Sequence, residues 1–305
     1  MKDSIVVVYI PAVGEYGSWY LEQFLGLYYS VVHKTELHER FDFLVTGPVD
    51  ILSQIPPDHC KFVPLDDLTE RPEFRYKYSG SPYGFAGSFA PFIDDACLEI
   101  IHQYKYALRI DVDTFLCPSM YYLRPREGLL AVGNAAYASE TARVKLPEIQ
   151  NKLGLSDRGL FNVGSTWYGD SQLITSAGSK SLEYVKYFLA EEFADGQGEW
   201  PQWFAGVILL YSAHLAVNEL SEDEVPNILQ SEKFDFHSSS EESVSSDEFK
   251  VFSIHCWHGP DYFSKFEYAK HGYSQVGEVF DSYKSCDYAL DCARGGTQLL
   301  EAGNA

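Results

Sequence analysis

The chain carries the stretch YALRIDVDTFL at residues 106–116. Its first half is an apolar run of the kind that forms a buried strand, and its second half places Asp111 and Asp113 two positions apart. Parallel strands in α/β proteins present ligands at their carboxyl ends. Aspartate also occurs at strand ends for reasons of turn geometry alone, but two crowded carboxylates repel each other unless a divalent cation lies between them. The stretch therefore predicts a metal site at the end of a central strand.

Strands and helices alternate on the N-terminal side of this stretch. Residues 5–10 are a continuous apolar run typical of a strand buried on both faces, and residues 41–46 form a second strand. Helical patterns span residues 18–33 and 87–103. This alternation predicts an α/β fold with a Rossmann-like, mixed and mostly parallel sheet flanked by helices, although no G-x-G-x-x-G fingerprint follows the first strand.

The C-terminal side contains a clear change of composition. A largely apolar segment at residues 200–220 predicts one buried helix, whereas residues 221–248 are acidic, rich in serine and poor in apolar residues. We interpret the second segment as an exposed excursion, because a strand pattern follows it at residues 251–254. A helix and tail are expected over residues 276–305, with fraying from Gln298 onward.

The composition argues against several classes of partner. A net charge of −21 over 305 residues repels the phosphates of nucleic acids and of anionic membrane surfaces. The six cysteines show no C-x-x-C spacing, so neither a zinc ribbon nor a dense disulfide scaffold is expected. No signal peptide or membrane-spanning run is visible, and we expect a soluble, cytoplasmic protein. A phosphorylated ligand would need a metal or a few basic side chains to offset the negative charge of the protein.

Two histidines, His255 and His258, follow the last predicted strand, beside a Gly-Pro turn and close to Lys265. Either imidazole is well placed to be a neutral metal ligand. Together with Asp111 and Asp113 it would complete a mixed oxygen and nitrogen set, which suits Mn²⁺ better than Ca²⁺. Lys265 could then meet a phosphate group as a point charge.

A loop rich in glycine, proline, serine and tyrosine spans residues 71–91. Loops of this length inside a compact domain are usually functional or mobile. Arg75 is one of few cations near the predicted site, and Tyr78 is one of several aromatic side chains that could stack on a base or a sugar. Both are candidate nucleotide- and sugar-binding residues, and a solvated surface loop is the alternative.

A phosphatase motif competes with this interpretation. Residues 111–114 also fit the D-x-D-x-T signature of haloacid-dehalogenase-like phosphatases, in which the first aspartate is a nucleophile and the second an acid/base. Gly169 and Asp170 imitate the later metal motif of that family, but Ile174 stands where the motif has its second aspartate. The signature also lies on the first strand in that family, whereas here several elements precede it.

The order of features resembles that of GT-A fold glycosyltransferases, in particular the glycogenin and bacterial galactosyltransferase type. The shared features are a β-α-β start and an Asp-x-Asp pair after an apolar strand. They also include the downstream Asn162-x-Gly164 and a late histidine at a strand end. The resemblance extends over roughly residues 5–266 as an ordering of elements, and its specific motif is Asp-x-Asp.

The resemblance implies roles for particular residues. Asp111, Asp113 and one of the two late histidines would hold Mn²⁺ (or Mg²⁺) on the diphosphate of a nucleotide sugar. Asn162 and Gly164 would line the sugar pocket, and Lys265 would meet the diphosphate.

The implied reaction is transfer of a sugar from a nucleotide sugar, with UDP or GDP as the expected nucleotide, to a glycan or other hydroxyl acceptor. If the reaction inverts, a carboxylate base must face the acceptor, and Glu199 and Asp170 are the candidates. The alternatives are a metal-dependent phosphohydrolase and a non-catalytic sugar-binding module on the same fold. We expect one GT-A-like domain over residues 1–305, with a nucleotide-binding half at about 1–117 and an acceptor and sugar half at about 118–275.

Overall fold

A seven-stranded sheet organises the computed structural model, which describes residues 2–11, 17–65, 68–238, 240–244, 250–256 and 283–303. In spatial order the strands are β3 (Cys60–Pro64), β2 (Phe41–Gly47), β1 (Ser4–Tyr9), β4 (Tyr106–Arg109), β7 (Val163–Asp170), β6 (Leu129–Asn134) and β8 (Asn227–Gln230). The first four are parallel to one another, β7 is antiparallel to both of its neighbours, and β8 is parallel to β6. The expected mixed, mostly parallel sheet is confirmed.

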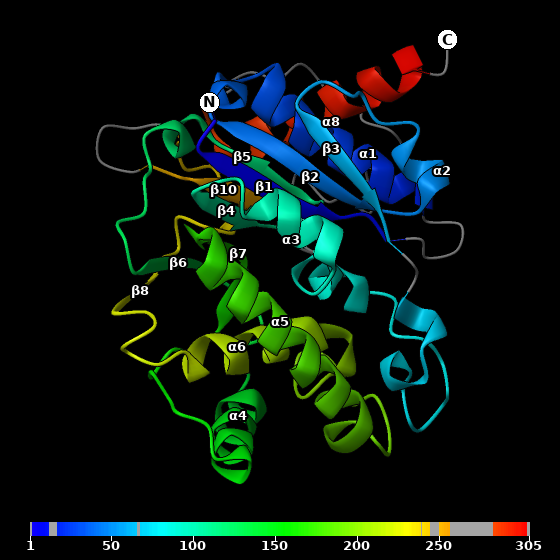
Figure 1. Ribbon diagram of the computed structural model, residues 1–305, viewed down its shortest axis with the longest axis vertical. Coiled ribbons are helices and arrows are strands. Elements are labelled where there is room, and N and C mark those ends of the chain that lie inside the picture. The colour runs from blue at the N-terminus through cyan, green and yellow to red at the C-terminus, as the bar shows by residue number, and fades with distance from the viewer. Residues whose placement is uncertain are drawn as a thin grey trace.

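Helices cover both faces of this sheet, as Figure 1 shows. On one face α1 (Gly17–Val32) packs against α8 (Ser285–Gly303), and on the other α5 (Ser171–Tyr187) packs against α6 (Ile208–Glu219). The remaining α-helices of the described ranges are α2 (Val49–Leu52), α3 (Asp95–Ile101) and α4 (Glu140–Leu153). Within those ranges, no helix combines the length and the apolar character that crossing a bilayer requires.

β1 explains why the sheet is covered on both sides. Every residue of the strand is buried, and successive side chains of a strand point to opposite faces. Ile5 and Val7 therefore belong to the core under α5 and α6, whereas Val6 and Val8 belong to the core under α1. The continuous apolar run in the sequence is the signature of this two-sided burial.

A second, three-stranded sheet joins distant parts of the chain. Its order is β5 (Thr114–Leu116), β10 (Ser253–His255) and β9 (Phe236–His237). β5 follows β4 after a short turn, in which the Thr114 N–H donates to the carbonyl of Asp111 at 3.2 Å. β10 pairs with β5 in antiparallel register, with His255 opposite Thr114.

The helix expected over residues 87–103 is two separate pieces. A 3₁₀ helix spans Ala86–Phe92 and contains Pro91, which has no N–H to continue a helical ladder. α3 then begins at Asp95, because Asp94 caps it by accepting a hydrogen bond from the Cys97 N–H at 3.0 Å.

Three expectations for the second half differ from the structure. The apolar segment at 200–220 is helical as α6 only from Ile208 onward, after a short 3₁₀ turn. The acidic segment at 221–248 is more than an excursion, because it supplies β8 and β9 to the two sheets. The C-terminal helix does not fray at Gln298, since Leu299 and Leu300 pack against the core under α1.

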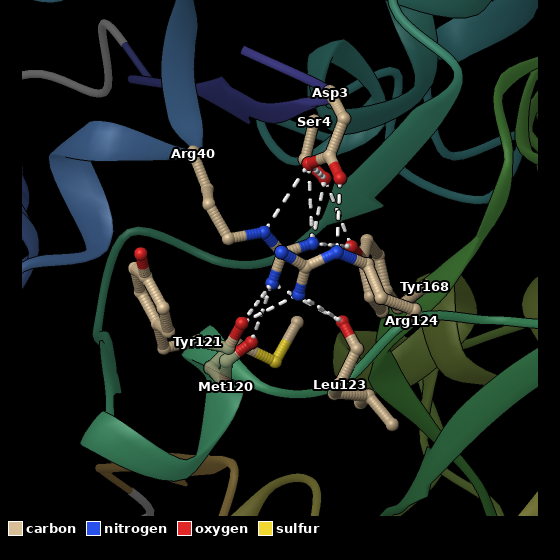
Figure 2. Close-up of polar contacts among 8 residues, drawn as sticks. All are labelled: Asp3, Ser4, Arg40, Met120, Tyr121, Leu123, Arg124 and Tyr168. Atoms are coloured by element: carbon tan, nitrogen blue, oxygen red, sulfur yellow. Dashed lines mark hydrogen bonds and ion pairs between the residues drawn. The ribbon is translucent and has the colours of Figure 1, made fainter.

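A buried arginine fastens the segment after β5 to the start of β2, as Figure 2 shows. One terminal nitrogen of Arg40 donates hydrogen bonds of 2.9, 2.7 and 3.2 Å to three backbone carbonyls of that segment, those of Met120, Tyr121 and Leu123. The other lies 3.1 Å from the Asp3 carboxylate and 3.1 Å from the Tyr168 hydroxyl. Asp3 also pairs with Arg124 at 3.0 Å. This cluster lies at the amino-terminal ends of β1 and β2, away from Asp111.

Candidate metal centre

The aspartate pair lies where the order of the sheet changes direction. From β1 the chain builds outward through β2 to β3 and then returns to β4 on the other side of β1. Open α/β sheets bind ligands at the carboxyl ends of the strands that flank such a point. β4 ends at Arg109, and Asp111 and Asp113 follow directly. The structure thus places the pair at the carboxyl end of a central strand.

A pocket of about 420 Å³ opens at this switch point, and Asp111, Asp113 and His255 are among its lining residues. The end of β1 and the first turns of α1 contribute Tyr9, Trp19, Tyr20 and Gln23 to the wall. The start of α6 contributes apolar side chains, including Leu209 and Leu210. A pocket of this size with a few convergent polar groups is typical of small-molecule sites.

Asp111, Asp113 and His255 form a group that can hold a metal ion. One ligand atom from each residue lies within 4.8 Å of the others. The His255 Nε2 atom is 3.3 Å from Asp113 Oδ1 and 4.0 Å from Asp111 Oδ2. The β5–β10 pairing brings the histidine there, and the Cys256 N–H extends the pairing by donating to the Asp113 carbonyl at 2.9 Å. Two carboxylates and one imidazole fit a divalent cation such as Mn²⁺.

Asp235 lies behind His255 and orients its ring. Asp235 Oδ1 is 3.4 Å from Nδ1 of His255, on the side away from the aspartate pair. The carboxylate also accepts hydrogen bonds from the Thr166 N–H at 2.9 Å, the Thr166 hydroxyl at 2.6 Å and the Ser165 hydroxyl at 3.2 Å. A carboxylate on the second nitrogen of a ligand histidine fixes which nitrogen faces the metal. Here it leaves Nε2 facing Asp111 and Asp113.

Two glycines make room for the Asp235 carboxylate. A Cβ added at Gly133 would lie 2.0 Å from Asp235 Oδ2, and one added at Gly164 would lie 2.2 Å from it. Gly164, expected in the sugar pocket, therefore lies behind His255. Asn162, with a φ of 60°, accepts a hydrogen bond from the Tyr137 N–H at 3.1 Å. Neither Asn162 nor Gly164 is among the described residues that line the pocket.

Carboxylates also control the protonation of His255. Burial favours the neutral imidazole, but Asp113 and Asp235 outweigh this effect and raise the pKa of His255 to about 10. The imidazolium then offsets part of the negative charge of the cluster. A divalent cation would supply positive charge in its place and would bind the deprotonated Nε2, so metal binding would release a proton.

Arg109 holds the other side of Asp111. Its side chain is 3% exposed, and one terminal nitrogen lies 2.8 Å from Asp111 Oδ1. The guanidinium lies beside the stacked rings of Phe89 and Trp167, at 5.1 and 5.7 Å from their centroids, and donates to the carbonyl of Ser165. Arg109 thus engages Oδ1 of Asp111 and leaves Oδ2 on the side of His255.

Two sequence candidates are not described by the structure, and two others lie outside the pocket wall. His258 and Lys265 fall outside the described residues, so their roles stay predictions. Arg75 pairs with Glu70 at 4.0 Å, and Tyr78 is exposed. Arg75 and Tyr78 are not among the described residues of the pocket wall.

The structure does not bring the two candidate bases to the aspartate pair. Asp170 pairs with Tyr106 at the start of β4, and it caps α5 by accepting from the Gln172 N–H at 3.0 Å. It therefore lies at the opposite end of β4 from Asp111, which also separates the two halves of the phosphatase-like pattern. Glu199 is exposed and is not part of the pocket wall formed by described residues.

The sequence reasoning missed Arg109 and Asp235. A signal existed for Arg109, which is a lone charge inside an apolar strand and therefore needs a buried partner. For Asp235 no local signal existed, because its contacts with Thr166 and His255 are long-range and its own segment is polar.

Fold and site together define an α/β protein with an Asp-Asp-His group at the switch point of its sheet. The chain belongs to the family described as "Domain of unknown function (DUF7164)", whose model matches residues 5–296. That range includes all three members of the group. A comparison with curated proteins finds no match.

A solved structure similar to this chain is that of mouse xyloside xylosyltransferase 1, in its apo crystal form. The match covers 83% of this chain and 97% of that chain, at 10% sequence identity and a TM-score of 0.44. A likeness this distant says nothing about the reaction of this chain, so the functional conclusion must come from the site.

Proposed function

We propose that this chain is a metal-dependent glycosyltransferase, which moves a sugar from a nucleoside diphosphate sugar to a hydroxyl acceptor. The observation that carries the proposal is the meeting of Asp111, Asp113 and His255 in a ligand-sized pocket at the switch point of the sheet. Nucleotides bind at such points in open α/β sheets. A cation held there also offsets the repulsion between an anionic ligand and a protein of net charge −21.

Each residue of the centre has a defined task in this proposal. Asp111, Asp113 and His255 hold Mn²⁺ or Mg²⁺, and a cation so held stabilises the negative charge that grows on a departing diphosphate. Arg109 and Asp235 fix the two ligand side chains they contact, Asp111 and His255. The aromatic and apolar wall of the pocket reduces the access of water to the sugar.

The geometry favours transfer over aspartyl-phosphate chemistry. In the phosphatase pattern the first aspartate attacks phosphorus, and a second acidic motif completes the metal site. Here the residue that imitates this second motif, Asp170, lies at the start of β4, at the opposite end of the strand from Asp111.

The donor is proposed to be a UDP- or GDP-sugar, and the acceptor a glycan or another hydroxyl compound. A retaining reaction needs no carboxylate base beside the acceptor, and neither Asp170 nor Glu199 is part of the proposed machinery. Lys265 remains a candidate contact of the diphosphate.

Thermal unfolding with nucleotides tests the proposal. UDP, GDP, CDP, dTDP and their sugars would each be added with Mn²⁺ or with EDTA. A ligand present at about 100 times its dissociation constant stabilises the folded protein by about 2.7 kcal/mol, which gives a clear rise in Tm. We expect one nucleotide to raise Tm only when Mn²⁺ is present, and Asp113→Asn to abolish that rise.

The matched control is Asp195→Asn, which changes an exposed carboxylate outside the pocket and should leave the rise intact. Sugar release or transfer from the stabilising donor would then be measured directly. The proposal is overturned if no nucleotide in the panel raises Tm with Mn²⁺. Sugar binding that survives both EDTA and Asp113→Asn would instead point to a non-catalytic sugar-binding module.

A further inference from the structure

Gln23 is an unusual member of the pocket wall. It lies on α1 one turn after Trp19 and Tyr20, so the three side chains share the part of the helix that borders the pocket. Gln23 is 9% exposed, and neither its amide nitrogen nor its amide oxygen has a hydrogen-bond partner among the described residues. A buried amide without partners is costly to the folded protein, because both groups lose the hydrogen bonds that water would provide.

The buried side-chain amide of Asn218 shows how hydrogen bonds within the protein usually satisfy such a group. Asn218 accepts hydrogen bonds from the N–H groups of Arg158 and Leu160 at 3.2 and 3.1 Å. Its amide nitrogen donates to the carbonyls of Leu160 and His214 at 3.3 and 2.9 Å. Gln23 is also buried and lines a pocket, but it has no comparable set of partners among the described residues. A pocket ligand is the natural partner for its two amide groups.

We propose that Gln23 is a specificity-determining residue that recognises the base of the donor nucleotide. The inference rests on the proposed function, which places the diphosphate at the Asp111–Asp113–His255 group. The base would then occupy the wall formed by α1 and the end of β1. A glutamine amide offers one donor beside one acceptor, and the hydrogen-bonding edge of a nucleobase offers the complementary pair.

The neighbouring side chains suit the same ligand. Tyr9, Trp19 and Tyr20 line the pocket together with Gln23. Aromatic rings give a flat base a stacking surface but do not distinguish one base from another. Paired hydrogen bonds to a buried amide do distinguish one base from another, because a mismatched base leaves the amide without hydrogen-bond partners. The aromatic side chains would therefore contribute affinity, and Gln23 would contribute the choice of base.

Comparing ligands with and without a base tests this inference. Calorimetry would measure the affinity of the stabilising nucleoside diphosphate and of pyrophosphate, each with Mn²⁺, for the wild type, Gln23→Met and Gln172→Met. Gln23→Met keeps the length of the side chain but removes both polar groups, and Gln172 is an exposed control on α5. We expect Gln23→Met to weaken the nucleotide about 10- to 100-fold. Its affinity for pyrophosphate should stay within about twofold, and Gln172→Met should change neither.

The outcomes separate this inference from the function on which it rests. If the nucleotide binds the wild type and Gln23→Met does not weaken it, or weakens pyrophosphate equally, the role of Gln23 is overturned while the metal-dependent nucleotide site stands. If no nucleotide binds the wild type, the proposed function is overturned and this role falls with it. Relaxed discrimination among UDP, GDP, CDP and ADP in Gln23→Met would support the role directly.

Discussion

Asp235 is the residue on which the geometry of His255 depends. It is 2% exposed, it accepts hydrogen bonds from the side chains and backbone of β7, and its own N–H donates to Ser253 on β10 at 3.1 Å. The carboxylate therefore connects the large sheet to the small one behind the metal ligands. Its position requires that no side-chain atom occupy the space beside Gly133 and Gly164.

Substitution of Gly164 tests how tightly that space is defined. In Gly164→Ala the new Cβ would lie 2.2 Å from Asp235 Oδ2 and 2.6 Å from the carbonyl carbon of Gly133, and backbone on one side cannot move away easily. We expect the free energy of unfolding to fall by about 1–3 kcal/mol. Mn²⁺ affinity should fall as well, because Asp235 must shift and His255 loses its support.

Urea denaturation and calorimetric titration with Mn²⁺ would measure these two effects. Gly196→Ala is the control, since nothing lies within 4 Å of a Cβ added there. Its stability should stay within about 0.5 kcal/mol of the wild type. A Gly164→Ala protein with wild-type stability and Mn²⁺ affinity would show that Asp235 is not confined as described.

At the scale of elements, the Arg40 cluster determines how the chain leaves β5. The guanidinium binds carbonyls of the segment that follows β5 and a carboxylate just before β1 (Figure 2). β5 also pairs with β10, which carries His255. The cluster therefore supports the frame of the site from the opposite end of the sheet.

Removal of the guanidinium tests this support. Arg40→Met should lower the free energy of unfolding by about 3 kcal/mol, because several buried oxygens lose a charged donor at once. Arg124→Met removes the second basic partner of Asp3, which is 41% exposed, and should cost less than about 1 kcal/mol. The urea concentrations at the midpoints of unfolding, compared at equal m-values, would show the difference in stability between the two variants. Equal losses in the two variants would argue against a special role for Arg40.

Some elements were predictable from the sequence because their signals are local. The two-sided burial of β1 produces an uninterrupted apolar run, and the expected residues 5–10 differ from Ser4–Tyr9 by one position. The break before α3 was also encoded locally, in Pro91 and in the capping residue Asp94, but the helical pattern across them obscured it.

The candidate site was predictable only in part, for a physical reason. Asp111 and Asp113 are recognisable as a site in the sequence, because two carboxylates at a strand end need a counter-charge. Which late histidine meets them depends on the β5–β10 register, and Asp235 depends on contacts with β7. Periodicity within one segment carries no information about such long-range pairings. The acidic composition around Asp235 even suggested the opposite, an exposed segment.

At the scale of the whole molecule, we expect stability to depend on pH through a histidine far from the aspartate pair in sequence. His214 is buried on α6, where its Nδ1 lies 3.2 Å from the Tyr137 hydroxyl. Burial lowers the pKa of His214 from 6.5 to about 4. The folded protein therefore keeps this imidazole neutral at pH values where the unfolded chain takes up a proton.

Acidification should lower the stability of the folded protein because of this difference in the protonation of His214. As pH falls from about 6.5 toward 4, the unfolded state binds a proton that the folded state does not, so His214 should reduce stability by roughly 3 kcal/mol over that window. Urea denaturation at pH 7 and at pH 4.5 would measure the loss. His214→Asn should show a smaller loss between the two pH values, whereas His102→Asn, at the exposed position directly after α3, should match the wild type. The same loss in all three proteins would exclude His214 as the cause.

The pairing of β5 with β10 has a consequence for how the protein is made. A ribosome synthesises Asp111 and Asp113 long before it reaches His255, so a nascent chain that has already built β1 to β4 still lacks the nitrogen ligand. Under the metal-dependent mechanism proposed above, tight retention of a cation would begin only after β10 has joined β5. An interrupted translation product that ends before His255 would then be inactive, because it lacks one of the three ligands.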